Sequence, residues 1–300
     1  MHIATSTADA PAMAGRHLWL RVLGVGLLVY ILSLAVLVLT GDTKLFPTVL
    51  WLGNFLVPAA YVAFFYGRRE HSNVSLPALL ETCFWGGILG ALLAVPVEAA
   101  LVHGHLLTLP VGLVVGAIEE WAKLLGVLVV ARRWRRMSEM DGVILGAAAG
   151  MGFAALESSG YAFGAFVGSG GRLTQETIFL VGESMLRGLF APLTHGTWTA
   201  LLVSVMFREQ GNRLRGTLKV TGAYLLVIVL HGLWDGTAAT IAPLADSQSS
   251  LWMLLVPAVM LGVGVCGLVL LRRRWHEAQR REQAVFAAPS GLEAAQQPVG

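Results

Sequence analysis

Residues 251–275 read LWMLLVPAVMLGVGVCGLVLLRRRW, a run of 21 residues without a charged side chain followed by three consecutive arginines and a tryptophan. The uncharged part, residues 251–271, is long enough as an α-helix to cross a hydrocarbon core of roughly 30 Å at about 1.5 Å per residue. Arginines at the end of such a run are typical of the point where a helix reaches the headgroups. The stretch therefore predicts a membrane-spanning helix.

The rest of the chain supports this class. Of 300 residues, 56% are hydrophobic and 13% are charged, with a mean hydropathy of +0.69, whereas a soluble domain carries about 25% charged residues. The runs that are long enough to span lie at about 18–40, 47–66, 79–102, 106–131, 141–167, 184–207, 217–242 and 251–271. They are continuous, not alternating, which excludes a barrel. We predict an all-α polytopic membrane protein with about eight transmembrane helices.

Lysine and arginine alternate sharply between the connections. The basic flanks hold Arg16, Arg21, Arg68, Arg69, Arg132, Arg133, Arg135, Arg136, Arg208, Arg213, Arg215, Lys219 and Arg272–Arg274. The other four connections hold only Lys44 and Arg172. The positive-inside rule then predicts that both termini are cytoplasmic. The basic residues report topology, so no nucleic-acid partner is expected.

One membrane-embedded domain is predicted, over residues 18–275. Residues 1–17 form a polar N-terminal tail. Residues 276–300 are rich in Ala, Gln, Pro and Glu without periodicity, which favours a disordered cytoplasmic tail. The two cysteines, Cys83 and Cys266, lie inside apolar runs and exclude both a disulfide scaffold and a cysteine-based zinc site.

Ionisable residues interrupt four of the apolar runs, although each costs about 2.5–3.5 kcal/mol at mid-bilayer. They are Glu119, Glu120, Lys123, Glu157, His195, His231 and Asp235. Glu119, His195 and His231 lie within a turn of the midpoints of their predicted helices. Glu157 and Asp235 lie about one turn further toward the outer leaflet. Shared depth on separate helices predicts one common site.

Helical spacing refines this prediction, because residues four apart share a face. His231 and Asp235 are then side by side, and Glu119 lies over Lys123. Glu120 points about 100° away from Glu119. We therefore expect Lys123 to hold Glu119, which leaves Glu120 as the favoured general base.

Other features have structural explanations. Trp198 and Trp234 are expected to pack. Arg187, near the outer end of its predicted helix, is expected to anchor the helix at the headgroups. Small residues recur every four positions, as in surfaces where membrane helices pack closely. These are Gly142, Gly146, Gly150, Ala154 and Ser158.

The residue types limit the chemistry. The chain has no HExxH zinc motif and no GxSxG motif, and Asp235 is the only mid-helix aspartate. Glutamate and histidine remain. A carboxylate can act as general base toward water, and two histidines with a carboxylate can hold Zn²⁺. The histidines can equally donate hydrogen bonds to an oxyanion without metal, and spacing does not choose between these.

Four short motifs resemble those of the PrsW-type intramembrane proteases, within the CAAX-protease and bacteriocin-processing superfamily. Residues 119–123, EEWAK, resemble its EExxK motif, and residues 153–157, FAALE, resemble FxxxE. His195, preceded by Arg187 and Pro192, resembles the third motif, and residues 231–235, HGLWD, resemble the HxxxD/N motif. The match runs in order over residues 115–240. One departure is Ser158, where the family commonly has Asn.

The resemblance implies a peptidase that cleaves within or near the bilayer. Glu119 or Glu120 would be the base, with His195 and His231 as metal ligands or oxyanion donors. Glu157 and Asp235 would complete the metal coordination or orient a histidine. Lys123 and Arg187 would support the site.

The resemblance also implies the setting of the reaction. The cofactor would be Zn²⁺, unless a glutamate acts without metal. The substrate would be a single-pass or lipid-anchored protein, such as an anti-sigma factor, in a bacterial cytoplasmic (inner) membrane.

Two other functions use the same residues. A proton- or cation-coupled transporter would use the carboxylates as a relay, but no inverted repeat is visible in the sequence. A non-catalytic scaffold would bind partner helices through the small residues and would tolerate loss of Glu120.

Overall fold

The computed structural model of the chain describes residues 15, 17–69, 72–102, 104–133, 137–210, 216–244 and 251–287, and these contain helices and no strands. The helices are α2 (Leu18–Thr40), α3 (Phe46–Tyr66), α4 (Leu76–Leu101), α5 (Leu109–Ala131), α6 (Glu139–Gly168), α7 (Gln175–Phe190), α8 (His195–Gln210), α9 (Leu218–Ile241) and α10 (Leu251–Ala287). Short 3₁₀ turns lie at Thr43–Leu45, Ala191–Leu193 and Ala242–Leu244.

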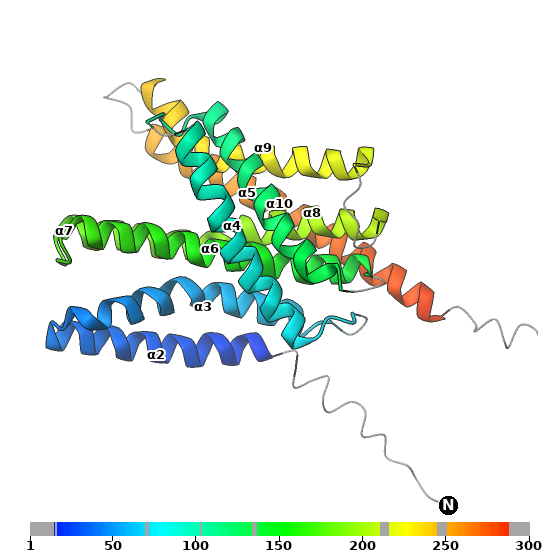
Figure 1. Cartoon of the computed structure of the whole chain (residues 1–300), viewed down its shortest axis with the longest axis horizontal. Coiled ribbons are helices and arrows are strands. Elements are labelled where there is room, and N and C mark those ends of the chain that lie inside the picture. The colour runs from blue at the N-terminus through cyan, green and yellow to red at the C-terminus, as the bar shows by residue number, and fades with distance from the viewer. Residues whose placement is uncertain are drawn as a thin grey trace, which may run out of the picture.

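The predicted all-α, polytopic fold is confirmed. Among the described residues, seven helical segments are long and apolar enough to cross a membrane. Helix α5 is as long as α2, and it carries Glu119, Glu120 and Lys123 in its centre. The start of α2 and the end of α10 lie on the same side of the bundle (Figure 1).

The helix predicted at 184–207 is broken in the structure. Helix α7 ends at Phe190, the turn Ala191–Leu193 follows, and α8 begins at His195. Pro192 explains the break, because proline cannot donate a backbone hydrogen bond and disfavours helical geometry in the residue before it. His195 is therefore the first residue of α8. The prediction that it lies within a turn of the midpoint of a longer helix is wrong.

The disordered tail predicted from residue 276 is wrong for its first part. Helix α10 continues to Ala287, and Ala278 is fully buried. Arg274 and Arg281 both reach Glu139 at the start of α6, at 3.0 and 2.8 Å. These ion pairs fix the polar half of α10 to the bundle. Residues 288–300, like most of the predicted N-terminal tail, lie outside the described residues.

Helix α6 forms the centre of the bundle, with 94% of its membrane-spanning window buried. Its glycines form a surface for close helix packing, as predicted, and the helix that packs there is α8. A Cβ on Gly146 would lie 2.6 Å from the carbonyl oxygen of Thr199, and one on Gly150 would collide with the carbonyl of His195. The close contact of α6 and α8 therefore sets the position of His195.

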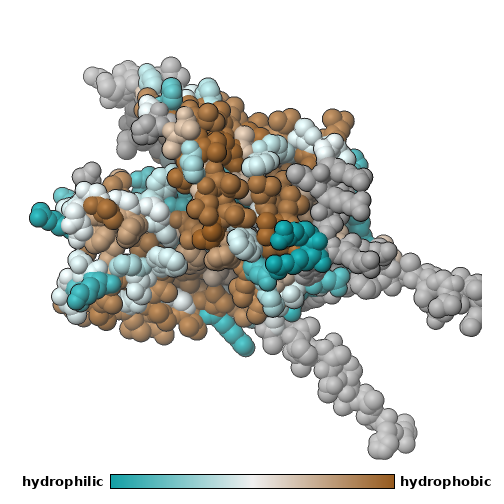
Figure 2. Space-filling view, viewed as in Figure 1, coloured by the Kyte–Doolittle hydropathy of each residue, from teal (hydrophilic) through white to brown (hydrophobic). Residues whose placement is uncertain are grey.

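The outer surface is apolar, as a lipid-facing surface requires. Helix α2 has only 6% of its window buried, and it exposes large side chains such as Leu28, Val38 and Leu39. Figure 2 shows hydrophobic residues across the middle of the molecule, with more hydrophilic residues toward the two ends of the helices. This pattern fits a protein surrounded by a bilayer.

Candidate active site

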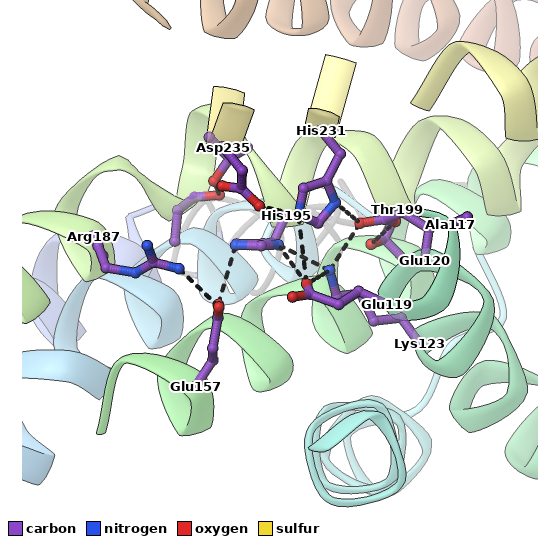
Figure 3. A network of polar contacts seen from close by, with 12 residues as sticks. Ala117, Glu119, Glu120, Lys123, Glu157, Arg187, His195, Thr199, His231 and Asp235 are labelled. Atoms are coloured by element: carbon purple, nitrogen blue, oxygen red, sulfur yellow. Dashed lines mark hydrogen bonds and ion pairs between the residues drawn. The ribbon is translucent and has the colours of Figure 1, made fainter. Parts of the chain in front are cut away.

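A network of polar side chains lies inside the bundle, where α5, α6, α7, α8 and α9 meet (Figure 3). It brings together Glu119, Glu120, Lys123, Glu157, Arg187, His195, Thr199, His231 and Asp235. All the candidate residues from the sequence analysis are thus neighbours. The network has buried contacts on one side and partly exposed ones on the other.

Lys123 is fully buried and contacts several members of the network. Its Nζ donates to Glu119 Oε2 at 3.0 Å and to Glu120 Oε1 at 2.8 Å. It also lies 2.9 Å from Nδ1 of His195 and 4.0 Å from the centre of the Phe153 ring. The expectation that Lys123 would hold Glu119 alone is therefore wrong, because a side chain between positions i−4 and i−3 reaches both carboxylates.

Glu120 has no oxygen without a partner. Oε1 accepts from Lys123 and lies 3.2 Å from Nδ1 of His231, and Oε2 accepts from Thr199 Oγ1 at 2.9 Å. The side chain is fully buried. A carboxylate that accepts a hydrogen bond from Nδ1–H of a histidine fixes the ring and leaves Nε2 free to act.

Glu119 faces both histidines. Its Oε2 lies 3.5 Å from Nε2 of His231 and 3.9 Å from Nδ1 of His195. On the far side of His195, Nε2 lies 3.4 Å from Oε2 of Glu157. Because an ammonium group can only donate, the contact with Lys123 makes Nδ1 of His195 an acceptor and places the ring proton on Nε2, toward Glu157.

Glu119, His195 and His231 could together hold a metal ion. One ligand atom of each lies within 4.8 Å of the others, and all three residues are buried. Nε2 of His231 has no hydrogen-bond partner among the described residues, yet it lies between Glu119 and Oδ2 of Asp235, the latter at 3.2 Å. Two carboxylates around an imidazole nitrogen favour a positive charge there, either a proton or a metal ion.

The outer side of the network is held by Arg187. Its Nη2 donates to Oε1 of Glu157 at 2.7 Å, and its guanidinium lies over the Tyr161 ring. Arg187 thus does more than anchor a helix at the headgroups, because it contacts a carboxylate of the network. Side-chain exposure rises from zero at His231 to 10% at Asp235, 14% at Glu157 and 33% at Arg187, so the site is reached from this side.

Sequence reasoning missed Glu98 and Thr199. Oε1 of Glu98, on α4, is buried without a hydrogen-bond partner in the described part of the chain, and the charges of Glu157, Lys123 and His231 act on this carboxylate. The cost of a carboxylate within an apolar run, applied to the span 79–102, could have found it. Thr199 carries no such signal, because threonine is common in membrane helices.

Comparison with protein families decides the class. Residues 75–265 match the family described as PrsW family intramembrane metalloprotease. The chain belongs to this family. The matched region begins at the start of α4 and contains the whole polar network. No curated protein and no solved structure matched the chain.

Membership of the PrsW family makes the chain a protease embedded in a lipid bilayer, with several spanning helices. The family is described as a metalloprotease, and the buried group of Glu119, His195 and His231 could hold a metal ion.

Proposed function

We propose that this PrsW-family protein hydrolyses a peptide bond of a membrane-anchored protein, with Glu119 as the group that accepts the proton of the attacking water. One observation carries the assignment. Oε2 of Glu119 faces a ring nitrogen of both histidines, while the group lies at the border between the buried and the accessible parts of the network. A water beside Glu119 would therefore also lie beside His195 and His231.

The neighbouring Glu120 is the weaker candidate for this role. Its two oxygens already accept from Lys123, Thr199 and His231. Each of these hydrogen bonds lowers the basicity of a carboxylate and removes a lone pair from reaction. We therefore assign Glu120 to the orientation of His231, in contrast to the expectation from helical spacing.

The residues present fit a metal ion. With a metal bound, Nδ1 of His195 would exchange its contact with Lys123 for the ion, and His195, His231 and Glu119 would hold Zn²⁺. Asp235 would be a further oxygen donor beside His231. The other ring nitrogen of each histidine faces a carboxylate, Glu157 at His195 and Glu120 at His231, as is usual for metal-bound imidazoles. A bound zinc ion would polarise the scissile carbonyl and acidify the water.

On the route without a metal ion, the protein's own groups would carry the proton transfers. Glu119 takes a proton as the water oxygen bonds to the carbonyl carbon, and charge develops on the carbonyl oxygen. His231, protonated at Nε2, can donate a hydrogen bond to that oxyanion. Glu119 then gives the proton to the amide nitrogen, the C–N bond breaks, and a carboxylic acid and an amine leave, which ionise to a carboxylate and an ammonium group.

The substrate class follows from the family resemblance and from the access side. A single-pass or lipid-anchored protein, such as an anti-sigma factor, would reach the network from the side of Arg187, Glu157 and Asp235. A bacterial cytoplasmic membrane with both termini cytoplasmic would be the setting. The alternation of basic connections supports that orientation.

The test uses newly formed protein ends. Wild type, Glu119→Gln and Glu81→Gln are expressed in a bacterial host, and new N-termini of membrane proteins are identified by mass spectrometry. Glu81 is a matched control, because it forms an exposed ion pair with Arg133. We expect the same new termini with wild type and Glu81→Gln and none with Glu119→Gln. Equal cleavage by Glu119→Gln would refute the assignment.

Metal content of the purified protein separates the two chemical routes. We expect stoichiometric zinc in wild type and its loss in the double variant His195→Ala, His231→Ala. If the wild type is active and contains no metal, hydrolysis uses Glu119 and the histidines without a metal ion.

A further inference from the structure

A groove lies away from the polar network, where the last turns of α8, the first turns of α9 and the middle of α10 meet. Its volume is about 460 Å³. The wall is formed by apolar and small side chains, among them Leu201, Leu226 and Leu270. Gly222 also lines it, and a Cβ at this glycine would meet no atom within 4 Å.

The rim of the groove is basic. It carries four cationic side chains, Arg208, Lys219, Arg273 and Arg274, against one carboxylate, Glu277. Two of the cations have close acidic partners just outside the groove. Lys219 reaches Glu209 at 3.1 Å, and Arg274 reaches Glu139 at 3.0 Å.

The two remaining cations are less satisfied. Arg208 lies 3.8 Å from Glu277 and 3.4 Å from Glu209. Arg273 is exposed and forms no ion pair with any residue that the structure describes. Pairing each rim cation with one carboxylate leaves Arg273 as the surplus positive charge at the rim, and Arg281 further shares Glu139 and Glu277.

The groove also lies at a membrane boundary. Its apolar wall is formed by Leu201 of α8, Leu226 of α9 and Leu270 of α10, which lies at the end of the apolar run. Its basic side chains lie at the end of α8, at the start of α9 and just after that run in α10. A ligand there would be apolar toward the bilayer and would carry a single negative charge at the surface. This is the chemistry of a phospholipid with a phosphodiester headgroup, and basic pockets between spanning helices bind such lipids.

We propose that the groove between α8, α9 and α10 is a binding site for one anionic phospholipid, with the phosphodiester between Arg208 and Arg273 and an acyl chain along Leu226 and Leu270. The proposal is independent of the function of the polar network. Inorganic phosphate would satisfy the rim and leave the apolar wall empty, so the lipid is the occupant that uses both.

The test measures lipid binding to the whole protein. Purified protein is titrated with phosphatidylglycerol and, separately, with phosphatidylcholine, and bound lipid is counted by native mass spectrometry. We expect one phosphatidylglycerol to bind tightly, and Arg273→Gln to weaken it about fivefold to tenfold. Arg272→Gln is the matched control, since Arg272 is on the same turn and exposed but does not line the groove.

A second variant tests the apolar part. Gly222→Leu adds a side chain where the protein leaves open space, so the variant is expected to fold and to lose the bound lipid. Three results would overturn the proposal: equal binding of phosphatidylcholine, equal weakening by Arg272→Gln, or unchanged lipid binding in Gly222→Leu. Competition by inorganic phosphate at equal concentration would do the same, because it would show that the acyl chain contributes nothing.

Discussion

The two ends of the polar network differ in how completely their groups are satisfied. At the inner end, Glu120, Lys123 and Thr199 are fully buried, and every side-chain polar group of Glu120 has a partner. At the outer end, Glu157 and Arg187 are partly exposed, and Oε2 of Glu157 and Nε of Arg187 have no hydrogen-bond partner among the described residues. A satisfied end holds geometry, and an unsatisfied end has hydrogen-bonding capacity left for a ligand.

Glu119 lies between the two ends and carries the largest expected effect. Glu119→Gln keeps the shape of the side chain and an acceptor for Lys123, and it removes the base. We expect kcat to fall by about 10²–10⁴-fold, with the melting temperature close to that of wild type. If the variant lost stability as well as activity, Glu119 would hold the geometry of the network, as the inner end does, and would not be the base.

The packing that positions His195 gives the next largest effect. Gly150→Ala would push α8 away, because its Cβ would collide with the carbonyl of His195. A misplacement of about 1 Å can cost about 10²-fold in rate, which a cleavage assay would report. Gly164→Ala, on the same helix, meets no atom within 4 Å and is the control. Equal activity of the two variants would show that the close contact of α6 and α8 does not set the position of His195.

The inner end is tested by Glu120→Gln. The substitution removes one of the charges around Lys123 and the carboxylate behind His231. We expect a loss of about 10–100-fold in metal affinity or activity and a fall in the free energy of unfolding of about 3 kcal/mol. Thermal unfolding of the reconstituted protein measures the second effect. An inactive but fully stable variant would contradict a holding role for Glu120 and would favour Glu120 as the base.

The smallest effect is expected at Glu98. This carboxylate is partly buried, with Oε1 unpartnered, and its charge acts on Glu157 and Lys123. Glu98→Gln should change kcat/KM by about threefold to tenfold through the charge at the outer end, without loss of stability. Which quantity changes, KM or the stability, shows to which end of the network Glu98 belongs. A change in KM alone would place Glu98 with substrate binding, and a loss of stability would place it with the framework.

The sequence predicted the class of fold and most members of the polar network, but not Thr199. Both rest on the same physics, since a bilayer requires long apolar helices and makes each buried charge costly. The glycines at 142, 146 and 150 were also interpreted correctly as a packing surface, because only small residues allow such a close approach of helices.

The pairing within the network could not be predicted. Helical spacing assigned Lys123 to Glu119, but a lysine side chain is flexible enough to contact Glu119, Glu120 and His195 at once. Arg187 looked like an interface residue, because its partner Glu157 belongs to a different helix. Such contacts depend on how helices distant in sequence pack.

By itself, then, the sequence determined that this protein spans a membrane and that it holds glutamates and histidines at a cost that a function must justify. The tertiary structure decided which of these groups are neighbours. It broke the helix at Pro192 so that His195 begins α8, it pressed α6 against α8, and it turned Glu120 toward Thr199 and His231 while Glu119 faced both rings. The apolar pattern of each helix is local, whereas the partners of a buried charge are set by the packing of the whole bundle.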